Sequence, residues 1–289
     1  MSIVLTGVRH TYGVGTPFEK TALHHIDLEI HAGEFVGIIG HTGSGKSTLV
    51  QILNGLLQPT EGTVTVDGIN IGKKDKEAMT MRHTVGMVFQ YPEYQLFEET
   101  IAKDIAFGPR NFGLNEEAVE ERVKEAMEFV GLDYETYAAR SPFRLSGGQM
   151  RRVAIAGVIA IHPAYLILDE PSAGLDPAGR REIFSEILRW HREKGITVIL
   201  VSHNMEDIAQ MADRLIVLDG GNIVLDGEPL RIFSEEEAIL RKAGVAVPPV
   251  TDVLRYLHGR GLPVQEHVKT VAEGAESIYA SLKGAEHAH

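Results

Sequence analysis

A short glycine-rich stretch contains the residues whose types and spacing most clearly predict a chemical role. Gly40-His41-Thr42-Gly43-Ser44-Gly45-Lys46-Ser47-Thr48 fits the phosphate-binding pattern G-x-x-x-x-G-K-[ST]. A short apolar run within residues 34–39 predicts a buried strand before this loop, and apolar residues recur after it at helical spacing, at Leu49, Ile52, Leu53 and Leu56. We therefore expect strand, glycine loop and helix in that order, with backbone N–H groups and the helix N-terminus directed at phosphate oxygens.

Two side chains of this loop have defined roles in such a pattern. Lys46 would reach the β- and γ-phosphates of a nucleotide, and the Ser47 hydroxyl would take one position around Mg²⁺. The alternative is a glycine-rich turn that matches without function, which average composition predicts in about one chain in a hundred of this length. Because the flanking strand and helix patterns are also present, the stretch predicts nucleotide binding.

An acidic pair follows a second predicted strand. The run Tyr165-Leu166-Ile167-Leu168 is apolar throughout, as in a parallel sheet covered on both faces, and leads directly into Asp169 and Glu170. Open α/β sheets bind ligands at the carboxyl ends of their strands. Asp169 suits Mg²⁺ coordination through water, and Glu170 suits a general base that polarises the attacking water. The alternative, solvated acids that cap a strand, is disfavoured because a phosphate loop is present.

Two further residues could contact a nucleotide, and each has a structural alternative. His203 follows the apolar run 197–201 and would lie at the same sheet edge as Glu170, where it could contact a γ-phosphate. A lone histidine is more often structural. Tyr12 ends the strand predicted at residues 3–12 and could stack on a nucleotide base, although by position alone an aromatic ring packed on the sheet is the better interpretation.

A second glycine turn leads into another helix. Ser146 is placed as the N-cap of a helix that begins in Leu145-Ser146-Gly147-Gly148-Gln149 and continues through residues 150–156. The N-terminus of this helix predicts a second anion site, although no lysine of its own accompanies it. One mononucleotide does not need two such sites from one chain. We therefore expect this turn to serve a nucleotide held by another chain.

The overall composition narrows the class of protein. The chain has 289 residues, of which 44% are apolar and 24% charged, as in a globular protein of one or two domains. It has no cysteine, which excludes a disulfide framework and a thiolate metal site and suits a reducing compartment. No segment reaches about 18 uncharged apolar residues, so no membrane span is predicted. The formal net charge of −12 argues against nucleic-acid binding.

The remaining pattern predicts an α/β core with additions. Alternating or apolar runs predict further strands at residues 3–12, 23–31, 63–68 and 85–89. Helical periods with charged faces occupy residues 98–160, including a helix at 116–130, so we expect a helical subdomain inserted into the core. Asp219-Gly220-Gly221 lies between two apolar runs within residues 214–225 and predicts a hairpin.

The C-terminal part is predicted to be appended to this core. Residues 234–243 predict one charged helix, and Val247-Pro248-Pro249-Val250 is typical of a linker. We expect a short helical tail after this linker. The last residues, 284–289, are expected to fray.

Taken together, the motifs resemble those of the ATP-binding-cassette (ABC) ATPases over roughly residues 1–235. The motifs occur in the same order as in the family: the phosphate loop, Gln90, the Leu-Ser-Gly-Gly-Gln pentapeptide, the acidic pair, a loop at 172–176 and His203. Average composition gives the pentapeptide by chance in fewer than about one chain in a thousand. The resemblance implies a P-loop NTPase fold with a parallel sheet, an antiparallel β subdomain, a helical subdomain inserted at about 91–160 and a C-terminal helical extension at 236–289.

The resemblance also implies a role for each motif. Two cassettes are expected to stack head to tail, with each ATP between the phosphate loop of one chain and the Ser146 turn of the other. Tyr12 is implied to stack on the base, which reverses the interpretation from position alone. The implied ATP contacts are Tyr12, Gly40, His41, Thr42, Gly43, Ser44, Gly45, Lys46, Ser47, Thr48, Ser146, Gly147, Gly148 and Gln149. Catalytic roles are implied for Glu170, His203 and Gln90, and Mg²⁺ binding for Ser47, Gln90 and Asp169.

Looser patterns are similar to the second of the two paired ATPase subunits of energy-coupling factor (ECF) transporters. They are found at residues 15–19, 90–97, 106–113 and 248–251. The resemblance implies an ATP-hydrolysing subunit of a vitamin or transition-metal importer, peripheral on the cytoplasmic face of the cell membrane. Its implied partners are a sister ABC ATPase or a second copy of itself, a membrane coupling subunit near residues 90–113 and a membrane substrate-binding subunit. Residues 236–289 would form an accessory dimerisation element.

Other classes of protein remain as alternatives. One is the ATPase subunit of a conventional ABC transporter. Another is a cassette ATPase of DNA repair or chromosome organisation, but these typically carry long coiled coils or zinc modules, and the sequence has neither long heptads nor cysteines. A translation-factor cassette would need two cassettes in one chain, but the motifs occur only once. An ATP-gated scaffold would lack the general base, but Glu170 is present. A small GTPase would need an N-K-x-D motif, which the sequence lacks.

Overall fold

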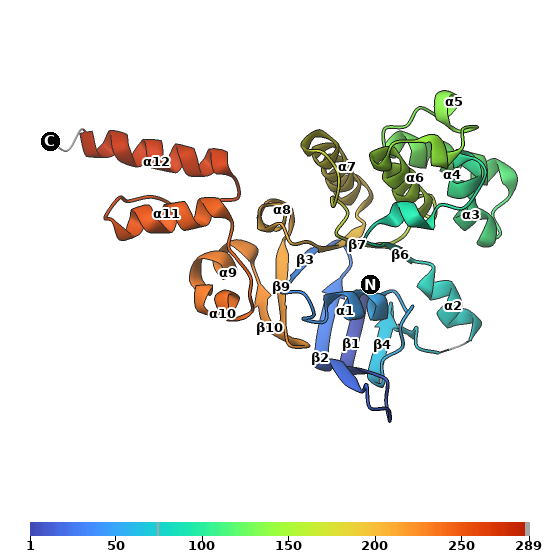
Figure 1. Ribbon diagram of the computed structural model, residues 1–289, viewed down its shortest axis with the longest axis horizontal. Helices are drawn as coiled ribbons and strands as arrows, with labels where there is room; N and C mark the ends of the chain where they lie inside the picture. The colour runs from blue at the N-terminus through green and yellow to red at the C-terminus, as the bar shows by residue number, and fades with distance from the viewer. Residues whose placement is uncertain (74, 287–289) are drawn as a thin grey trace.

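The computed structural model describes residues 1–73 and 75–286, and two sheets with flanking helices account for its main body (Figure 1). A six-stranded sheet lies at the centre, in the order β10-β9-β3-β8-β7-β6. Its strands are β3 (Phe35–Ile39), β6 (Val85–Val88), β7 (Tyr165–Asp169), β8 (Thr197–Val201), β9 (Arg214–Asp219) and β10 (Asn222–Gly227). Neighbouring strands pair in parallel, except that β10 pairs antiparallel with β9 at one edge.

The parallel strands are buried because their residues face two separate cores. Every residue of β3 is buried; Val36 and Ile38 belong to one core, and Phe35 and Ile39 belong to the other. The residues of β7 and β8 are divided between the same two cores. A strand covered on both faces has no solvent-facing position, which explains the continuous apolar runs in the sequence.

The first core lies between the central sheet, α1 (Lys46–Leu53) and a four-stranded antiparallel sheet. That sheet has the order β2-β1-β4-β5 and comprises β1 (Ser2–Tyr12), β2 (Lys20–His31), β4 (Glu61–Val66) and β5 (Ile69–Asn70). A short helix, α2 (Lys76–Arg82), is capped by Asp75 and leads to β6. The helix α1 contributes Leu49, Val50, Ile52 and Leu53 to this core. The helix that follows the glycine loop is therefore anchored between two sheets.

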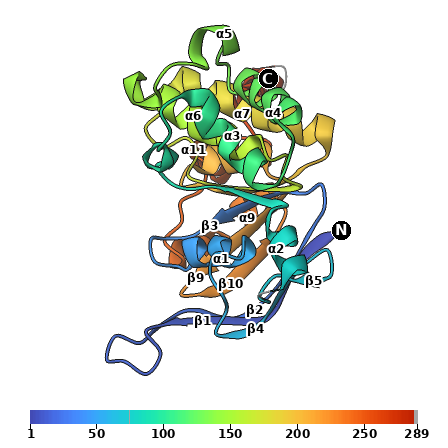
Figure 2. The same ribbon diagram turned by 90° about the vertical axis from the view of Figure 1, so that its right-hand side faces the viewer.

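The second core lies under helices on the opposite face of the central sheet. It contains residues of α7 (Pro177–Lys194), α8 (Met205–Met211) and the helical block expected at residues 98–160. With the preceding η1 (Pro92–Gln95), that block comprises α3 (Ile101–Asn111), α4 (Glu116–Phe129), α5 (Tyr134–Tyr137), η2 (Pro142–Arg144) and α6 (Gly147–Ile159). Figure 2 shows these helices together at one end of the molecule, with α1 and β1 toward the other. The predicted α/β fold with an antiparallel β part and an inserted helical part is confirmed.

The single helix expected at residues 234–243 is wrong. The structure has two helices there, α9 (Pro229–Glu235) and α10 (Glu237–Lys242). Glu236 between them has φ −109° and ψ 30°, which lies outside helical geometry. Phe233 before this break and Leu240 after it are both buried in the second core. Packing of both side chains on the same core therefore prevails over the continuous helical pattern of the sequence.

The linker expected at residues 247–250 is only partly right: residues 245–248 are neither helix nor strand, whereas the second proline starts a helix. Pro249 is the first residue of α11 (Pro249–Gly259), a position where proline forfeits no helical hydrogen bond. The tail is longer than expected, because α12 (Val271–Glu286) continues through residues 284–286, which were expected to fray. Residues 287–289, which belong to the same expectation, lie outside the described residues. Together α11 and α12 enclose a small separate core around Leu254, Val264 and Val268.

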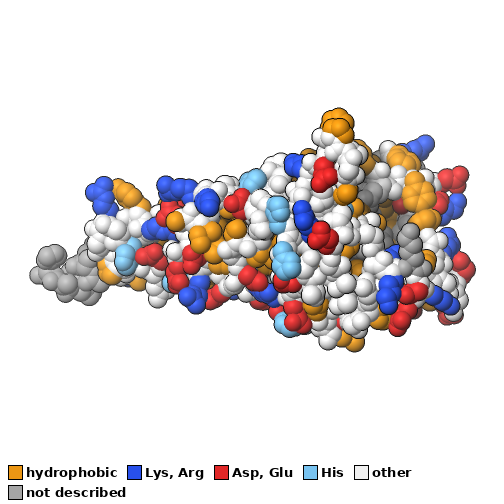
Figure 3. All heavy atoms as spheres, turned by 90° about the horizontal axis from the view of Figure 1, so that it is seen from below, with side chains coloured by type: hydrophobic (Ala, Val, Ile, Leu, Met, Phe, Trp, Pro, Cys, Tyr) orange, Lys and Arg blue, Asp and Glu red, His pale blue; other side chains and the backbone are white. Residues whose placement is uncertain are grey.

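The C-terminal helices give the molecule an elongated outline. The helices α11 and α12 pack against each other and project beyond α9 and α10 (Figure 1). Seen from below, basic and acidic side chains are interspersed over the surface, with hydrophobic groups between them (Figure 3). Within residues 1–73 and 75–286, no helix is both long enough and apolar enough to cross a bilayer.

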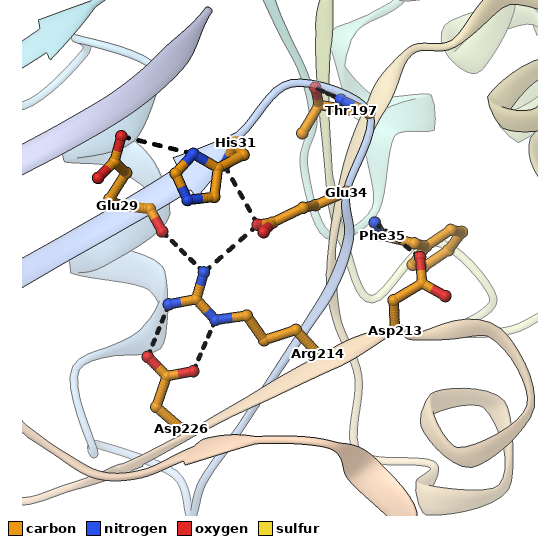
Figure 4. A network of polar contacts seen from close by, with 9 residues as sticks. Glu29, His31, Glu34, Phe35, Thr197, Asp213, Arg214 and Asp226 are labelled. Atoms are coloured by element: carbon orange, nitrogen blue, oxygen red, sulfur yellow. Dashed lines mark hydrogen bonds and ion pairs between the residues drawn. The ribbon is translucent and has the colours of Figure 1, made fainter.

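A polar network at the amino ends of the parallel strands joins the two sheets (Figure 4). Arg214, the first residue of β9, donates two hydrogen bonds to Asp226 of β10, at 2.6 and 2.7 Å. Its Nη1 donates to the Glu29 carbonyl oxygen of β2 at 2.8 Å and to Glu34 Oε2 at 3.3 Å. The guanidinium therefore links β10, β2 and the turn before β3. These amino ends of the parallel strands are opposite to the carboxyl ends, where the glycine loop begins.

We predict that Arg214→Ala lowers the free energy of unfolding by about 2 kcal/mol, because Asp226 and Glu34 lose a partly buried partner. The loss is smaller than for a fully buried pair, since the Arg214 side chain is 25% exposed. Urea titration followed by circular dichroism measures it. The control is Arg9→Ala, which removes the exposed pair of Arg9 with Glu61 and should change stability by less than about 0.5 kcal/mol. Equal losses in the two variants would contradict this role of Arg214.

Candidate functional site

The predicted site residues converge on one edge of the central sheet. Because β3, β6, β7 and β8 run in parallel, their carboxyl ends meet at the same edge. The glycine loop follows β3, and Gln90 lies just beyond β6. Asp169 ends β7 with Glu170 next to it, and His203 lies just beyond β8. The sheet topology thus brings together residues that are far apart in the sequence.

The glycine loop is closed around the side chain of its own lysine. Lys46, the first residue of α1, is buried, and its Nζ donates hydrogen bonds to the carbonyl oxygens of Gly40 at 2.7 Å and His41 at 2.9 Å. These bonds use two of the three N–H donors of an ammonium group and leave the third for an anion. Burial lowers the pKa of Lys46, and the negative charges of Glu170 and Asp169 act against that effect.

Two positions of the loop require glycine because the backbone approaches other strands closely. Gly40 has φ 154°, and a Cβ there would lie 2.3 Å from the Leu218 carbonyl oxygen of β9. Gly45 has φ 107°, and a Cβ there would lie 2.8 Å from the Ala22 carbonyl oxygen of β2. Neither position has room for a side chain, and both backbone conformations favour glycine. The loop therefore fits between β2 and β9 only with these two residues.

The acidic pair lies beside the lysine, with Asp169 buried and Glu170 half-buried. Burial raises the pKa of Asp169, and Lys46 acts in the opposite direction. Burial, and after it the charge of Asp169, raises the pKa of Glu170 to about 7. Among the described residues, Glu170 Oε1 has no hydrogen-bond partner, and His203 Nε2 lies 3.5 Å from it. A half-buried carboxylate with a raised pKa at the carboxyl ends of parallel strands is the arrangement expected of a general base.

Glu170 is also held in an uncommon backbone conformation. Its φ is 52°, in the left-handed region, which costs of order 1 kcal/mol or more in a residue other than glycine. Its amide donates to the Val201 carbonyl oxygen at 3.0 Å, which ties it to the end of β8 near His203. Such strain persists only where the surroundings impose it, and it concentrates at functional sites. Burial, and after it the charge of Lys46, lowers the pKa of His203.

A cavity of about 520 Å³ opens beside these groups. Most of the predicted site residues line it: Tyr12, Thr42, Gly43, Gly45, Lys46, Ser47, Thr48, Gln90, Asp169, Glu170 and His203. The Tyr12 side chain is not buried in the sheet, since the residue is 43% exposed, and its hydroxyl lies 3.1 Å from Thr48 Oγ1. The residue therefore lies at the cavity, and its stacking on a base stays a prediction.

Three residues of the predicted loop support it without lining the cavity. Gly40 and Ser44 are buried against neighbouring backbone. The His41 ring contacts Asp219, with Nε2 at 3.1 Å from Asp219 Oδ1, and its Nδ1 lies 2.7 Å from the Thr42 carbonyl oxygen. Contact of Gly40 and His41 with a phosphate would therefore come from their backbone N–H groups, whereas the Ser44 amide donates to the His41 carbonyl oxygen at 3.1 Å.

The second glycine turn lies outside this cavity. Ser146 caps α6 as predicted: its Oγ accepts a hydrogen bond from the Gln149 amide at 3.3 Å, and Gln149 Oε1 accepts one from the Ser146 amide at 3.1 Å. Ser146 and Gly147 are exposed. Within the described part of the chain, residues 146–149 are not among those that line the cavity. This turn is the part of the predicted site that the single chain does not bring to the others.

One wall of the cavity is not predicted by any sequence motif. It consists of Lys20, Thr21 and Ala22 at the start of β2 and of Gly220 and Gly221 between β9 and β10. The Gly221 amide donates to the Ser44 carbonyl oxygen at 3.0 Å. The sequence does predict the Gly220-Gly221 hairpin, but its place beside the glycine loop depends on the pairing of β9 with β3. No local pattern reveals that pairing.

Comparison with known proteins agrees with this geometry. The protein family described as ABC transporter matches residues 23–173, which span the glycine loop, Gln90, the Ser146 turn and the acidic pair. The chain belongs to this family and is an ATP-binding and ATP-hydrolysing subunit of the ABC type.

Individual relatives show which members of the family this chain is similar to. The energy-coupling factor transporter ATP-binding protein EcfA2 of Clostridium perfringens (strain 13 / Type A) is 57% identical over 98% of this chain and 99% of its own length. The structure of cbiO1 from Clostridium perfringens, part of the ABC transporter complex cbiONQ, is 37% identical with a TM-score of 0.71 and covers 83% of this chain and 93% of that one. The dimeric post-hydrolysis structure of the ATP-binding cassette MJ0796 with ADP and Pi is 32% identical, with a TM-score of 0.71 over 78% of this chain and 98% of that one.

We predict that Tyr12→Ala raises the dissociation constant for ATP about tenfold, because a base stacked on an aromatic ring contributes roughly 1–3 kcal/mol. Tyr12→Phe keeps the ring and removes only the hydroxyl contact with Thr48, so it should change the constant by less than about threefold. Isothermal titration calorimetry measures both variants. If Tyr12→Phe lost as much affinity as Tyr12→Ala, the hydroxyl and not the ring would be responsible, and base stacking would be wrong.

Proposed function

We propose that this chain powers a membrane importer of the ECF type, for a vitamin or a transition-metal ion, from the cytoplasmic face of the cell membrane. The observation that carries the proposal is the cluster of Lys46, Asp169 and Glu170 beside a cavity of nucleotide size. The similarity to an ECF ATP-binding protein over nearly the full length of both chains supports the transporter type.

Hydrolysis of ATP requires a water molecule directed at the γ-phosphate and positive charge around the phosphoryl oxygens. We assign the first task to Glu170, whose raised pKa suits proton acceptance near neutral pH. Lys46 would hold the β- and γ-phosphate oxygens with its remaining N–H, and the loop amides at the start of α1 would add further donors. Gln90 and His203 line the same cavity and would orient the γ-phosphate and the water.

The site also fits Mg²⁺ bound together with ATP. Ser47, Gln90 and Asp169 line the cavity and carry hydroxyl, amide and carboxylate oxygens, which are ligands that Mg²⁺ prefers. Among the described residues, no three His, Asp or Glu side chains form a metal cage by themselves. Mg²⁺ commonly binds to one or two carboxylates together with substrate phosphates, so a cage made only of protein side chains is not needed. The bound ion would neutralise charge on the phosphate oxygens.

We propose that each ATP lies between two ATPase chains. The Ser146 turn is exposed and separate from its own chain's cavity, so its helix N-terminus is available to a nucleotide held elsewhere. A second copy of this chain or a sister ABC ATPase would present Ser146, Gly147, Gly148 and Gln149, or their counterparts, to the open side of the cavity. The dimeric structure of MJ0796 supports pairing within the family. Contacts made only in the closed pair would make ATP favour closure and hydrolysis release it.

A groove beside the helical block supports docking of the membrane coupling subunit. It has a volume of about 640 Å³, and its lining includes eight residues of the predicted contact region 90–113, namely Gln95, Leu96, Phe97, Asp104, Phe107, Gly108, Asn111 and Phe112. Phe97 and Phe107 are 57% and 46% exposed and pack edge to face. Exposed aromatic side chains in a groove suit an amphipathic helix of the coupling subunit. Through that subunit, the complex would include the membrane substrate-binding subunit.

We also propose two units within the chain: a nucleotide-binding domain at residues 1–235, with its helical subdomain at about 91–160, and an accessory dimerisation element at 236–289. The helix α10 still packs into the second core through Leu240, whereas α11 and α12 have a core of their own. Tyr256 and Tyr279 are each 61% exposed on these helices. Exposed aromatic surface of this kind suits contact with a second ATPase chain.

We predict that Glu170→Gln lowers the ATP hydrolysis rate at least about 100-fold, because the amide cannot accept a proton from water. ATP binding should persist, so ATP-bound pairs should accumulate. Phosphate release measures hydrolysis, and size-exclusion chromatography with ATP measures pairing, for the chain alone and with its sister ATPase. Glu193→Gln, an exposed change near the end of α7, is the control and should behave like the unaltered chain. Undiminished hydrolysis by Glu170→Gln would rule out Glu170 as the base.

We predict that the double variant Phe97→Ser/Phe107→Ser reduces the coupling subunit that co-purifies from detergent extracts at least about fivefold. Each change removes an aromatic side chain that docking would bury, at roughly 1–2 kcal/mol. Phe18→Ser is the matched control, since Phe18 is 87% exposed and does not line the groove. Full co-purification of the double variant would place the docking site elsewhere.

A further inference from the structure

Arg151 is a buried charged residue with no role in the chemistry proposed above. It lies on α6, in the helix that begins after Ser146, and its side chain is 3% exposed. Its Nε and Nη2 donate to Glu93 Oε2 and Oε1, each at 3.2 Å, and the Glu93 side chain is 16% exposed. Two parallel bonds between a guanidinium and a carboxylate fix both the distance and the direction of the contact. The pair therefore joins α6 to η1, the segment that follows Gln90.

The turn before Glu93 is strained. Tyr91 directly follows Gln90 and has φ 58°, a left-handed conformation that is unfavourable for a residue with a side chain. The residue also precedes Pro92, which restricts its backbone further. The Arg151 guanidinium carbon lies 5.8 Å from the centre of the Tyr91 ring, within the range of a cation–π interaction. Arg151 thus contacts this turn both through the Tyr91 ring and through the carboxylate of Glu93.

The same guanidinium faces the loop that follows the acidic pair. A Cβ at Gly174 would lie 3.7 Å from Arg151 Nη1, an ordinary contact distance. Gly174 belongs to the segment that leads from Glu170 to Asp176, the N-cap of α7. One buried side chain therefore lies where three segments meet: the turn after Gln90, the loop after Glu170 and the helix that starts after Ser146.

We propose that Arg151 is a positioning residue that couples the Gln90 turn to the Ser146 turn. Gln90 lines the nucleotide cavity, whereas Arg151 is not among the described residues that line it, so Arg151 acts through the segments it joins and not on ATP itself. A shift of Gln90 toward bound nucleotide changes the strained turn at Tyr91. The two hydrogen bonds that Arg151 donates to Glu93 transmit that change to α6. The orientation of the Ser146 turn toward the partner chain then depends on the nucleotide in its own chain. This coupling rests on the proposed enclosure of ATP by two chains.

Two conservative variants separate coupling from mere stabilisation. Arg151→Lys keeps the charge but cannot form two parallel bonds, and Glu93→Gln keeps the shape but removes the charge. In the complete transporter, we expect each to lower the maximum hydrolysis rate about tenfold, the scale of coupling between sites in proteins. The dissociation constant for ATP, measured by calorimetry on the full-length chain alone, should change less than about twofold in each. The double variant should be no slower than the slower single variant, since both changes remove one contact.

The neighbouring arginine provides a matched control. Arg152 lies on the same helix, but it pairs with Glu182 of α7 and donates to the Val130 carbonyl oxygen at 3.0 Å, which are not part of the Gln90 turn. Arg152→Lys should therefore hydrolyse ATP within about twofold of the unaltered transporter. Unfolding temperatures of all variants show whether a loss of rate follows a loss of stability.

Three results would overturn the coupling. One is hydrolysis by Arg151→Lys at the unaltered rate, and another is rate losses that multiply in the double variant. The third is an ATP affinity that falls as much as the rate, because Arg151 would then act on nucleotide binding. If Arg151→Lys does not fold, Glu93→Gln decides the matter by the same rate and affinity measurements. An unaltered transporter that hydrolyses no ATP would refute the proposed function and the coupling with it, whereas normal rates in both variants would refute the coupling alone.

Discussion

A buried lysine held between its own loop and two carboxylates is the interaction on which the site depends. Lys46 donates to the carbonyl oxygens of Gly40 and His41, and Asp169 and Glu170 supply the opposing charge. Burial alone would favour the neutral form of all three side chains, lowering the pKa of the lysine and raising that of both acids. Their mutual attraction works against these shifts. The balance leaves an N–H donor and two carboxylates of raised pKa at the same cavity, where a nucleotide phosphate would bind.

The parallel sheet makes this arrangement possible. Strands β3, β7 and β8 lie next to one another, so that the groups at their carboxyl ends meet without any local sequence relation. The opposite edge is fastened by Arg214, which ties the antiparallel sheet and β10 to the start of β3 (Figure 4). Residues that stabilise the fold and residues that do chemistry therefore occupy opposite ends of the same strands.

The chain carries two glycine turns before helices but brings only one of them to the cavity. Figures 1 and 2 both show α6 among the inserted helices and α1 with the sheets. Under the proposed enclosure of ATP by two chains, a second ATPase chain would supply the other turn. The groove proposed to receive a membrane helix also involves the inserted helices, so one layer of helices would serve both the nucleotide and the transporter. Arg151 lies at the base of that layer, next to the turn after Gln90.

Local patterns predicted those parts of the site that depend on residues close in sequence. The glycine loop, the cap formed by Ser146 and the strand before Asp169 all follow from spacing within about ten residues. The break at Glu236 does not, because packing of Phe233 and Leu240 on one core decides it. The helix that starts at Pro249 has a recognisable signal, since proline is favoured at the first helical position.

Contacts between distant segments leave no local signal. The wall formed by Gly221 depends on the pairing of β9 with β3, and the partner of Arg151 lies 58 residues away in the sequence. Residue types and spacing alone left the role of Tyr12 open and did not address Gln90. The roles expected of both came from the resemblance to ABC ATPases. The structure then placed both at the cavity.

Enclosure of ATP by two chains is tested most directly by a structure of the ATPase pair with Mg²⁺ and a non-hydrolysable ATP analogue. We predict that the triphosphate contacts Lys46 and its loop in one chain and the serine-glycine turn of the other, with Ser146 in turn contacting the nucleotide held by the partner. A triphosphate enclosed entirely by residues of a single chain would contradict this mechanism.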